Sequence, residues 1–115
     1  MRALFLTCRE AGDVTIVDFS GRISLGEGSA LLRKTIRELI ENGQTKILLN
    51  LEDVNYIDSS GIGELVSGFS AVRNSNGELK LLNLTKKVHD LLQITKLFTV
   101  FDVYSDESTA VNSFR

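Results

Sequence analysis

The sequence predicts an α/β fold, with a mixed, mostly parallel sheet of about five strands and about four helices. Three observations predict it. The chain opens with two apolar runs separated by a polar turn, continuous apolar runs recur later, and segments with apolar residues at helical spacing lie between those runs. Helices that alternate with strands pack over a mostly parallel sheet, and the opening pair leaves one strand antiparallel at or near an edge.

The opening pair spans residues 3–7 and 14–19, and we expect it to form a hairpin across a turn at residues 9–13. The next segment is helical, because apolar residues recur at helical spacing. Its apolar positions are Leu32, Ile36, Leu39 and Ile40. Asn42 and Gly43 then supply the left-handed stop that commonly ends a helix.

A strand is expected at residues 46–51, because KILLNL is nearly continuous in apolar residues, as is typical of a strand buried on both faces. A second helix follows it. One face of that helix carries Ile62, Leu65, Val66, Phe69 and Val72. Asn76 and Gly77 mark its exit, and a further apolar run at residues 79–84 completes a strand, helix, strand unit. Such a unit implies a right-handed parallel crossover.

The C-terminal part continues the alternation. Thr85 can cap a helix, residues 100–103 give a short strand, and Ser105 can cap a last helix. The apolar positions of these two helices are Val88, Leu91 and Leu92 in the first and Ala110, Val111 and Phe114 in the second. No linker or repeat interrupts the chain.

Composition narrows the possible functions. Hydrophobic residues make up 43% and charged residues 24% of the 115 residues, which is ordinary usage for a folded protein. The length allows one core, so we expect a single domain spanning residues 1–115. The 13 basic and 15 acidic residues give a formal charge of −2, which disfavours binding to nucleic acid.

Cys8 and His89 are the only cysteine and histidine, so neither an internal disulfide nor a Cys/His zinc set can form. We expect no metal and no cofactor. The opening MRALFLTCRE lacks the long apolar core and cleavage site of a secretory signal, and no stretch approaches the roughly 20 apolar residues of a membrane span. Together with the unpaired cysteine, this favours the cytoplasm and no membrane association.

The segment EDVNYIDSSGIGE, residues 52–64, is predicted to be a loop between the strand that ends near Leu51 and a helix that begins near Ser60. Loops at the carboxyl end of a central strand usually hold the sites of open α/β sheets. Asp58, Ser59 and Ser60 are all helix-capping types, so a purely structural cap is one interpretation. The other is a modified serine, because the helix dipole and free N–H groups would favour a phosphate on Ser59.

The charges around this segment determine what a phosphate on Ser59 would do. Between residues 52 and 72 the acidic residues are Glu52, Asp53, Asp58 and Glu64, and there is no lysine or arginine. A phosphate adds about −1.5 to −2 charge, which we expect to enter an acidic neighbourhood. If the loop inserts into a partner, burial of that charge opposes binding, and every ~1.4 kcal/mol changes the affinity tenfold. One hydroxyl can therefore act as a release switch.

The run LNLEDVNYIDSSGIGELV, the later strand LKLLNL and the segment KKVHDLLQITKLFTVF together resemble the anti-sigma factor antagonist family, a branch of the STAS domains. The resemblance covers nearly the whole chain, and its most specific part is the run Asp-Ser-Ser-Gly-Ile-Gly between strand and helix. It implies that a cognate anti-sigma factor, itself a serine kinase, phosphorylates the first serine after the aspartate. The unphosphorylated form would bind that kinase and so release the sigma factor.

The resemblance implies that Ser59 is the phosphate acceptor and Asp58 its neighbour at the partner surface. Gly61 and Gly63 would be tight-packing positions in the first helical turn. The expected partner contacts are Asp58, Ser59, Ser60, Gly61, Ile62 and Gly63. A serine phosphatase that acts on the phosphorylated form is a second expected partner. In GRISLGEG, Ser24 stands where members of the family commonly have an aspartate, in a loop that often borders the partner site.

Two other functions stay open. A constitutive adaptor, as a STAS-type subunit of a transporter or signalling assembly, would use Ser59 only as a cap. A small hydrolase would need a base beside Ser59, yet His89 is the only histidine and no G-x-S-x-G motif occurs. Neither a dinucleotide fingerprint nor a P-loop is present, so any kinase activity must come from the partner. We therefore do not expect an enzyme.

Overall fold

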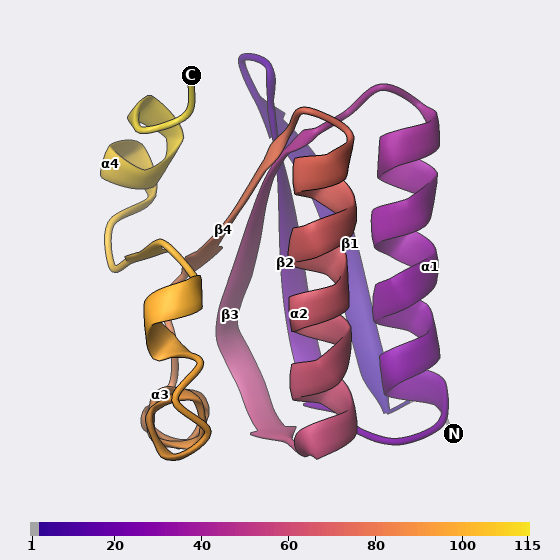
Figure 1. Cartoon of the computed structure of the whole chain (residues 1–115), viewed down its shortest axis with the longest axis vertical. Helices are drawn as coiled ribbons and strands as arrows, with labels where there is room; N and C mark the ends of the chain where they lie inside the picture. Colours follow the sequence, from indigo (N-terminus) through magenta and orange to yellow (C-terminus); the bar gives the residue numbers. More distant parts are fainter. Residues whose placement is uncertain (1–2) are drawn as a thin grey trace.

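The computed structural model describes residues 3–115 and contains one five-stranded sheet (Figure 1). In chain order the elements are β1 (Leu4–Ala11), β2 (Val14–Ile23), α1 (Glu27–Glu41), β3 (Lys46–Ile57), α2 (Ser59–Asn74), β4 (Glu78–Leu82), α3 (Lys86–Ile94), a 3-10 turn (Phe98–Val100), β5 (Val103–Tyr104) and α4 (Glu107–Asn112). The strands lie in the order β1-β2-β3-β4-β5, with β1 antiparallel to β2 and all other pairs parallel. The predicted mixed, mostly parallel sheet of about five strands and four helices is confirmed.

The opening hairpin is confirmed, but its strands are longer than predicted. β1 pairs along its whole length with residues 14–21 of β2, and the turn consists of Gly12 and Asp13 alone rather than residues 9–13. The polarity of Arg9 and Glu10 indicates a turn, yet both lie in β1. Because β1 is an edge strand, polar side chains on it can point into water.

The strand β3 also extends beyond its prediction. It continues past residues 46–51 to Ile57, and α2 begins at Ser59, so the predicted loop at residues 52–64 is wrong except at Asp58. The pairing of β3 with β2 shifts register twice, and such β-bulges break the alternation of side chains between the two faces. As a result, buried Val54 and Ile57 are separated by two exposed residues instead of one, and the strand pattern is hidden in the sequence.

The short strand predicted at residues 100–103 is present, but its bounds are wrong. A 3-10 turn, Phe98–Val100, occupies its beginning, and β5 is only the two-residue strand Val103–Tyr104. Phe101 between them is buried in the core at 5% exposure. The apolar residues of this segment therefore serve mainly to bury Phe101 in the core, and only its end forms a strand.

Of the two predicted helix caps in this region, one is confirmed. The hydroxyl of Thr85 accepts a hydrogen bond from the backbone N–H of Val88 at 3.3 Å. Ser105 does not cap the last helix, because Asp106 takes that position and accepts from the N–H of Thr109 at 2.9 Å. Both residues are good capping types, so the sequence alone did not separate them.

The two faces of the sheet carry separate apolar clusters, because successive side chains of a strand point to opposite faces. The larger cluster lies beneath α1, α2 and α3, and Figure 1 shows α1 and α2 side by side across that face. The smaller cluster lies on the opposite face under α4. Its buried members are Val14, Ile16, Leu48, Leu82 and Ala110. Val111 and Phe114 pack against it, which confirms the predicted inward face of the last helix.

Lys80 is a buried charge that holds the C-terminal segment onto this second face. Its Nζ donates hydrogen bonds to the carbonyl of Ser113 at 3.0 Å and to the Ser113 hydroxyl at 2.8 Å. The same ammonium lies 4.8 Å from the ring centroid of Phe114, within the range of a cation–π contact. These contacts satisfy a lysine that is only 5% exposed.

The ends of β2 and β3 bring the loop before α1 close to the start of α2. The two parallel strands finish side by side, with Ile23 paired to Ile57. Beyond them the chain enters residues 24–26 ahead of α1 and Asp58 ahead of α2. Two loops distant in sequence therefore meet at one edge of the sheet.

Candidate functional site

The first turn of α2 is organised by the carboxylate of Asp58. Asp58 is the N-cap residue, with extended backbone, and its Oδ1 accepts from the N–H of Gly61 at 2.9 Å. Its Oδ2 accepts from the N–H of Leu25 at 3.0 Å. One carboxylate thus satisfies a free donor of the helix start and also holds the neighbouring loop.

These hydrogen bonds lower the pKa of Asp58 below its usual value. The bond from the Gly61 N–H contributes most, followed by the bond from the Leu25 N–H, because both stabilise the charged form. Asp58 therefore stays ionised in the folded protein to lower pH than in the unfolded chain.

A second contact joins the same loop to α2 through serine hydroxyls. The hydroxyl of Ser29, which is 3% exposed, donates to the carbonyl of Ser24 at 2.9 Å. Its oxygen lies 3.0 Å from the hydroxyl of Ser60. Since a hydroxyl has a single hydrogen, Ser60 is the donor of that second bond. Ser60 is therefore a structural link between α1 and α2.

Ser59 differs from both of its neighbours. It is the first residue of α2, and its side chain is exposed. Within residues 3–115 its hydroxyl takes part in no hydrogen bond, whereas Asp58 provides the cap and Ser60 reaches Ser29. The capping interpretation therefore applies to Asp58 and leaves the Ser59 hydroxyl available.

The residues that follow split into buried and exposed ones. A Cβ added at Gly61 would lie 2.3 Å from the carbonyl oxygen of Ile23, so only glycine fits there. Ile62 is 3% exposed and belongs to the core. Gly63 is exposed, and a Cβ there would meet no heavy atom within 4 Å. Tight packing inside the domain is thus correct for Gly61 and wrong for Gly63.

The electrostatic surroundings are less acidic than the sequence indicates. Glu64 forms an ion pair with Arg33 of α1, with Arg33 Nη2 at 2.6 Å from Glu64 Oε2. Glu52 and Asp53 lie within β3 and line separate hollows of the surface, away from the α2 start. The expected acidic neighbourhood is therefore only partly correct. Ionised Asp58 lies beside Ser59, whereas Glu64 is paired with Arg33 and Glu52 and Asp53 line other parts of the surface.

Sequence reasoning missed Leu25. Its side chain is 81% exposed, and its N–H is held by Asp58, so a large apolar group is displayed beside the start of α2. A leucine placed between Ser24 and Gly26 in a glycine-rich loop was the available signal, since such a residue has no place in a helical or strand pattern. Leu25, Ser59 and Gly63 are the exposed residues of this site.

No side chain suited to activate the serine lies in contact with it among the described residues. His89 Nδ1 is 3.7 Å from Asp90 Oδ1, and the imidazole packs edge-on against Phe98. The described part of the chain holds no group of three or more His, Cys, Asp or Glu residues that could bind a metal ion. None of its helices is long and apolar enough to cross a membrane.

The fold and this site define a small α/β domain that presents an exposed, preorganised helix start. The chain belongs to the STAS domain family, whose family model matches residues 6–110.

Comparisons with individual proteins agree with this assignment. The chain is 34% identical over 87 residues to the anti-sigma-B factor antagonist of Bacillus subtilis, covering 76% of this chain and 78% of that one. Its fold matches an anti-sigma factor antagonist from Mycobacterium paratuberculosis with a TM-score of 0.84 at 16% identity, over 96% and 92% of the two chains. It also matches the Bacillus cell fate determinant SpoIIAA in its phosphorylated form, with a TM-score of 0.73 at 20% identity over 94% and 97%. Relatives of this chain are thus anti-sigma factor antagonists.

The two glycines of the α2 start make a matched test of the packing. Gly61→Ala should destabilise the domain by about 1–3 kcal/mol, because the new methyl group overlaps the carbonyl of Ile23. Gly63→Ala should leave stability unchanged or raise it by up to about 1 kcal/mol, because alanine favours a helix and the space is open. Urea denaturation of both variants measures this, and equal effects would contradict the assigned packing.

Asp58→Ala should cost about 0.5–2 kcal/mol of stability at neutral pH through loss of the cap. Because the folded pKa of Asp58 is lowered, its contribution is full above the unfolded carboxyl pKa of about 4 and is lost as pH falls through the folded pKa. The stability gap between wild type and variant should therefore narrow below about pH 4. Urea unfolding of both proteins at several acidic pH values measures this difference in stability. A difference that stays constant as pH falls would exclude Asp58 as an ionised cap.

Proposed function

We propose that this protein is an anti-sigma factor antagonist. Its unphosphorylated form binds a serine-kinase anti-sigma factor and so releases the sigma factor, and phosphorylation at Ser59 abolishes that binding. The observation that carries the proposal is the state of the Ser59 hydroxyl, which is exposed and unpartnered in the described structure while Asp58 supplies the cap. The family resemblance and the anti-sigma factor antagonists among its relatives support it.

The position of Ser59 allows a phosphate without loss of the fold. The N–H groups of the first turn of α2 and the helix dipole favour an anion there, by about 0.3–1 kcal/mol at an exposed position. The Ser59 hydroxyl holds no contact in the described structure that modification would break. Control through this residue would therefore act on binding rather than on folding.

The same position explains why a phosphate would release a partner. An interface that covers the α2 start would bury about −1.5 to −2 charge beside the ionised carboxylate of Asp58. The Arg33 guanidinium is already engaged by Glu64, so compensation from α1 would require breaking that pair. Burial of an uncompensated charge costs several kcal/mol, which corresponds to a large loss of affinity.

The proposed docking surface consists of Leu25, Ser59 and Gly63, with Asp58 and Ser60 half-exposed at its centre. Leu25 supplies an apolar anchor of the kind that contributes strongly when a partner excludes water from it. Gly63 leaves room for close approach of a partner's backbone. Gly61 and Ile62 support this surface from beneath, since both are buried.

A reversible switch also requires an enzyme that removes the phosphate. We infer a serine phosphatase as the second partner, acting on the same exposed position. We place the exchange in the cytoplasm, as the single unpaired cysteine favours.

Incubation with the cognate kinase and ATP should place phosphate on Ser59 and not on Ser60, whose hydroxyl is engaged by Ser29. Peptide mass spectrometry locates the modification, and the Ser59→Ala variant should remain unmodified. Phosphate found only elsewhere would overturn the assignment of the site.

Ser59→Asp should weaken kinase binding by tenfold or more, about 1.4 kcal/mol or above, with little change in stability, because the added charge lies at a helix start. Ser70→Asp is the matched control. Ser70 is exposed, lies on the same face of α2 and is three turns, roughly 16 Å, further along the helix. Calorimetric titration with the kinase compares the affinities of the Ser59→Asp and Ser70→Asp variants. Unchanged binding of Ser59→Asp would favour a constitutive adaptor.

Leu25→Ala should weaken kinase binding by about 1–2 kcal/mol, because an exposed apolar anchor is removed. Stability should change by less than about 0.5 kcal/mol, since the side chain packs on little. Phe5→Ala serves as the control. Phe5 is also exposed, at 57%, but lies in the edge strand β1. Equal losses for both variants would show that the docking surface is elsewhere.

A further inference from the structure

A second candidate site lies where the chain leaves β4 and β5. After β4 the chain turns into α3, which packs with the larger apolar cluster, and after β5 it turns into α4, on the opposite face (Figure 1). Neighbouring parallel strands whose following helices lie on opposite faces leave a crevice outside their carboxyl ends. In open α/β sheets that crevice is where ligands bind.

A cavity of about 570 Å³ occupies this position. Its volume falls within the range of sites for small molecules. The ends of β4 and β5 contribute Asn83, Tyr104 and Ser105 to its lining, β3 contributes Glu52, and Phe98 and His89 close the side toward α3. No residue of the α2 start lines it, so the cavity is separate from the site at Ser59.

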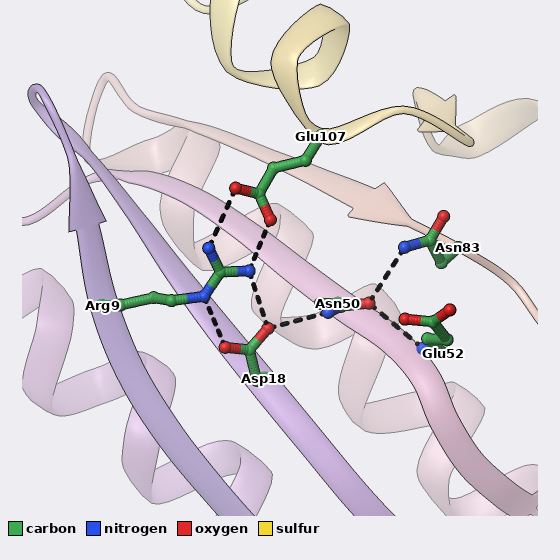
Figure 2. Close-up of polar contacts among 6 residues, drawn as sticks. All are labelled: Arg9, Asp18, Asn50, Glu52, Asn83 and Glu107. Carbon is green, nitrogen blue, oxygen red and sulfur yellow. Dashed lines mark hydrogen bonds and ion pairs between the residues drawn. The ribbon is translucent and has the colours of Figure 1, made fainter.

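The polar end of this cavity is held by Asn50, as Figure 2 shows. Its Oδ1 accepts from the N–H of Glu52 at 3.2 Å and from the Nδ2 of Asn83 at 3.5 Å. Its Nδ2 donates to Asp18 Oδ1 at 2.7 Å. Asp18 is in turn fixed by Arg9, whose Nε lies 2.6 Å from Asp18 Oδ2. A network running from β1 to β4 therefore preorganises the backbone of Glu52 and the side chain of Asn83.

The groups left free in this network are hydrogen-bond acceptors. The Glu52 carboxylate forms no ion pair or hydrogen bond within residues 3–115, and the Asn83 carbonyl oxygen is likewise unpaired there, because only its NH₂ group contacts Asn50. Asn83 adopts a left-handed conformation with φ of 57°, which asparagine tolerates at turns. The cavity thus combines a free carboxylate and a free amide oxygen with aromatic walls.

We propose that this cavity binds a small organic cation that carries an amine, amidine or guanidinium group. Glu52 supplies the opposite charge and Asn83 a neutral acceptor. The rings of Phe98 and Tyr104 offer apolar and π surfaces, which attract cations. An anionic ligand would meet the unpaired carboxylate and is disfavoured.

The cations around the cavity do not cancel this preference. Lys80 Nζ lies 5.6 Å from the Tyr104 ring centroid but is engaged by Ser113 and lies 3.7 Å from Glu78 Oε1. Lys86, at the start of α3, forms an ion pair with Asp90 at 2.7 Å. Lys87 is exposed and is not part of the lining. Glu52 is therefore the one acidic side chain of the lining and has no cationic partner in the described structure.

Titration of the ¹⁵N-labelled protein with benzamidine tests the proposal, because this probe joins an amidinium to a flat ring. Amide signals of Asn83, Tyr104 and Ser105 should shift and saturate at millimolar probe. Benzamide, a neutral analogue of the same shape, should bind at least tenfold more weakly, and benzoate should cause no saturable shift. Equal binding of benzamide, or absence of shifts with benzamidine, would overturn the proposal.

Two variants that replace a carboxylate by an amide of the same shape test whether the Glu52 charge binds the cation. Glu52→Gln should weaken benzamidine binding at least tenfold, whereas Asp53→Asn, at the neighbouring exposed carboxylate outside this lining, should change it less than twofold. Unchanged binding of Glu52→Gln would refute the role of the carboxylate. N-acetyl-arginine-methylamide distinguishes the source of the cation. If it binds at least tenfold more tightly than benzamidine, the cavity favours the arginine side chain of a partner, and weaker binding than benzamidine favours a free small molecule.

Discussion

The carboxylate of Asp58 is the interaction on which the rest of the site depends. It accepts from Gly61 within α2 and from Leu25 across the loop before α1, so a single residue sets both the first turn of the helix and the neighbouring loop. Because Asp58 takes the role of the cap, Ser59 is left with an exposed hydroxyl that serves no structural purpose in the described chain. Because the cap and the link to α1 are supplied by Asp58 and Ser60, the phosphorylation proposed at Ser59 is compatible with a stable fold.

The sheet explains why two unrelated surfaces can coexist in so small a domain. Parallel strands bring all their following loops to one edge, and the order of β2 to β5 spreads those loops across the width of the sheet. The α2 start lies beyond β3, whereas the cavity lies beyond β4 and β5, beside α3. The network of Arg9, Asp18 and Asn50 joins the side chains of β1, β2 and β3.

Much of the fold and part of the site could be predicted from local patterns. Continuous apolar runs, helical periodicity and the Asp-Ser-Ser-Gly segment identified the sheet, the helices and the position of Ser59. The full length of β3 could not be predicted, because β-bulges spaced Val54 and Ile57 as no regular strand would. The expected acidic surroundings of Ser59 were only partly correct, because Glu64 pairs with Arg33, which is distant in sequence.

The sequence by itself determined that a strand is followed by a helix whose start carries capping and hydroxyl side chains. Capping preference, glycine spacing and helical periodicity act over a few residues, so local patterns are enough to predict such a start. Only the tertiary structure decided the role of each residue there: Asp58 is the cap, Ser59 has the free hydroxyl in the described structure, and Ser60 links α2 to α1. It also decided that Leu25 stands beside them and that Glu52 faces a cavity. These outcomes depend on hydrogen bonds and packing between distant segments, which no local pattern records.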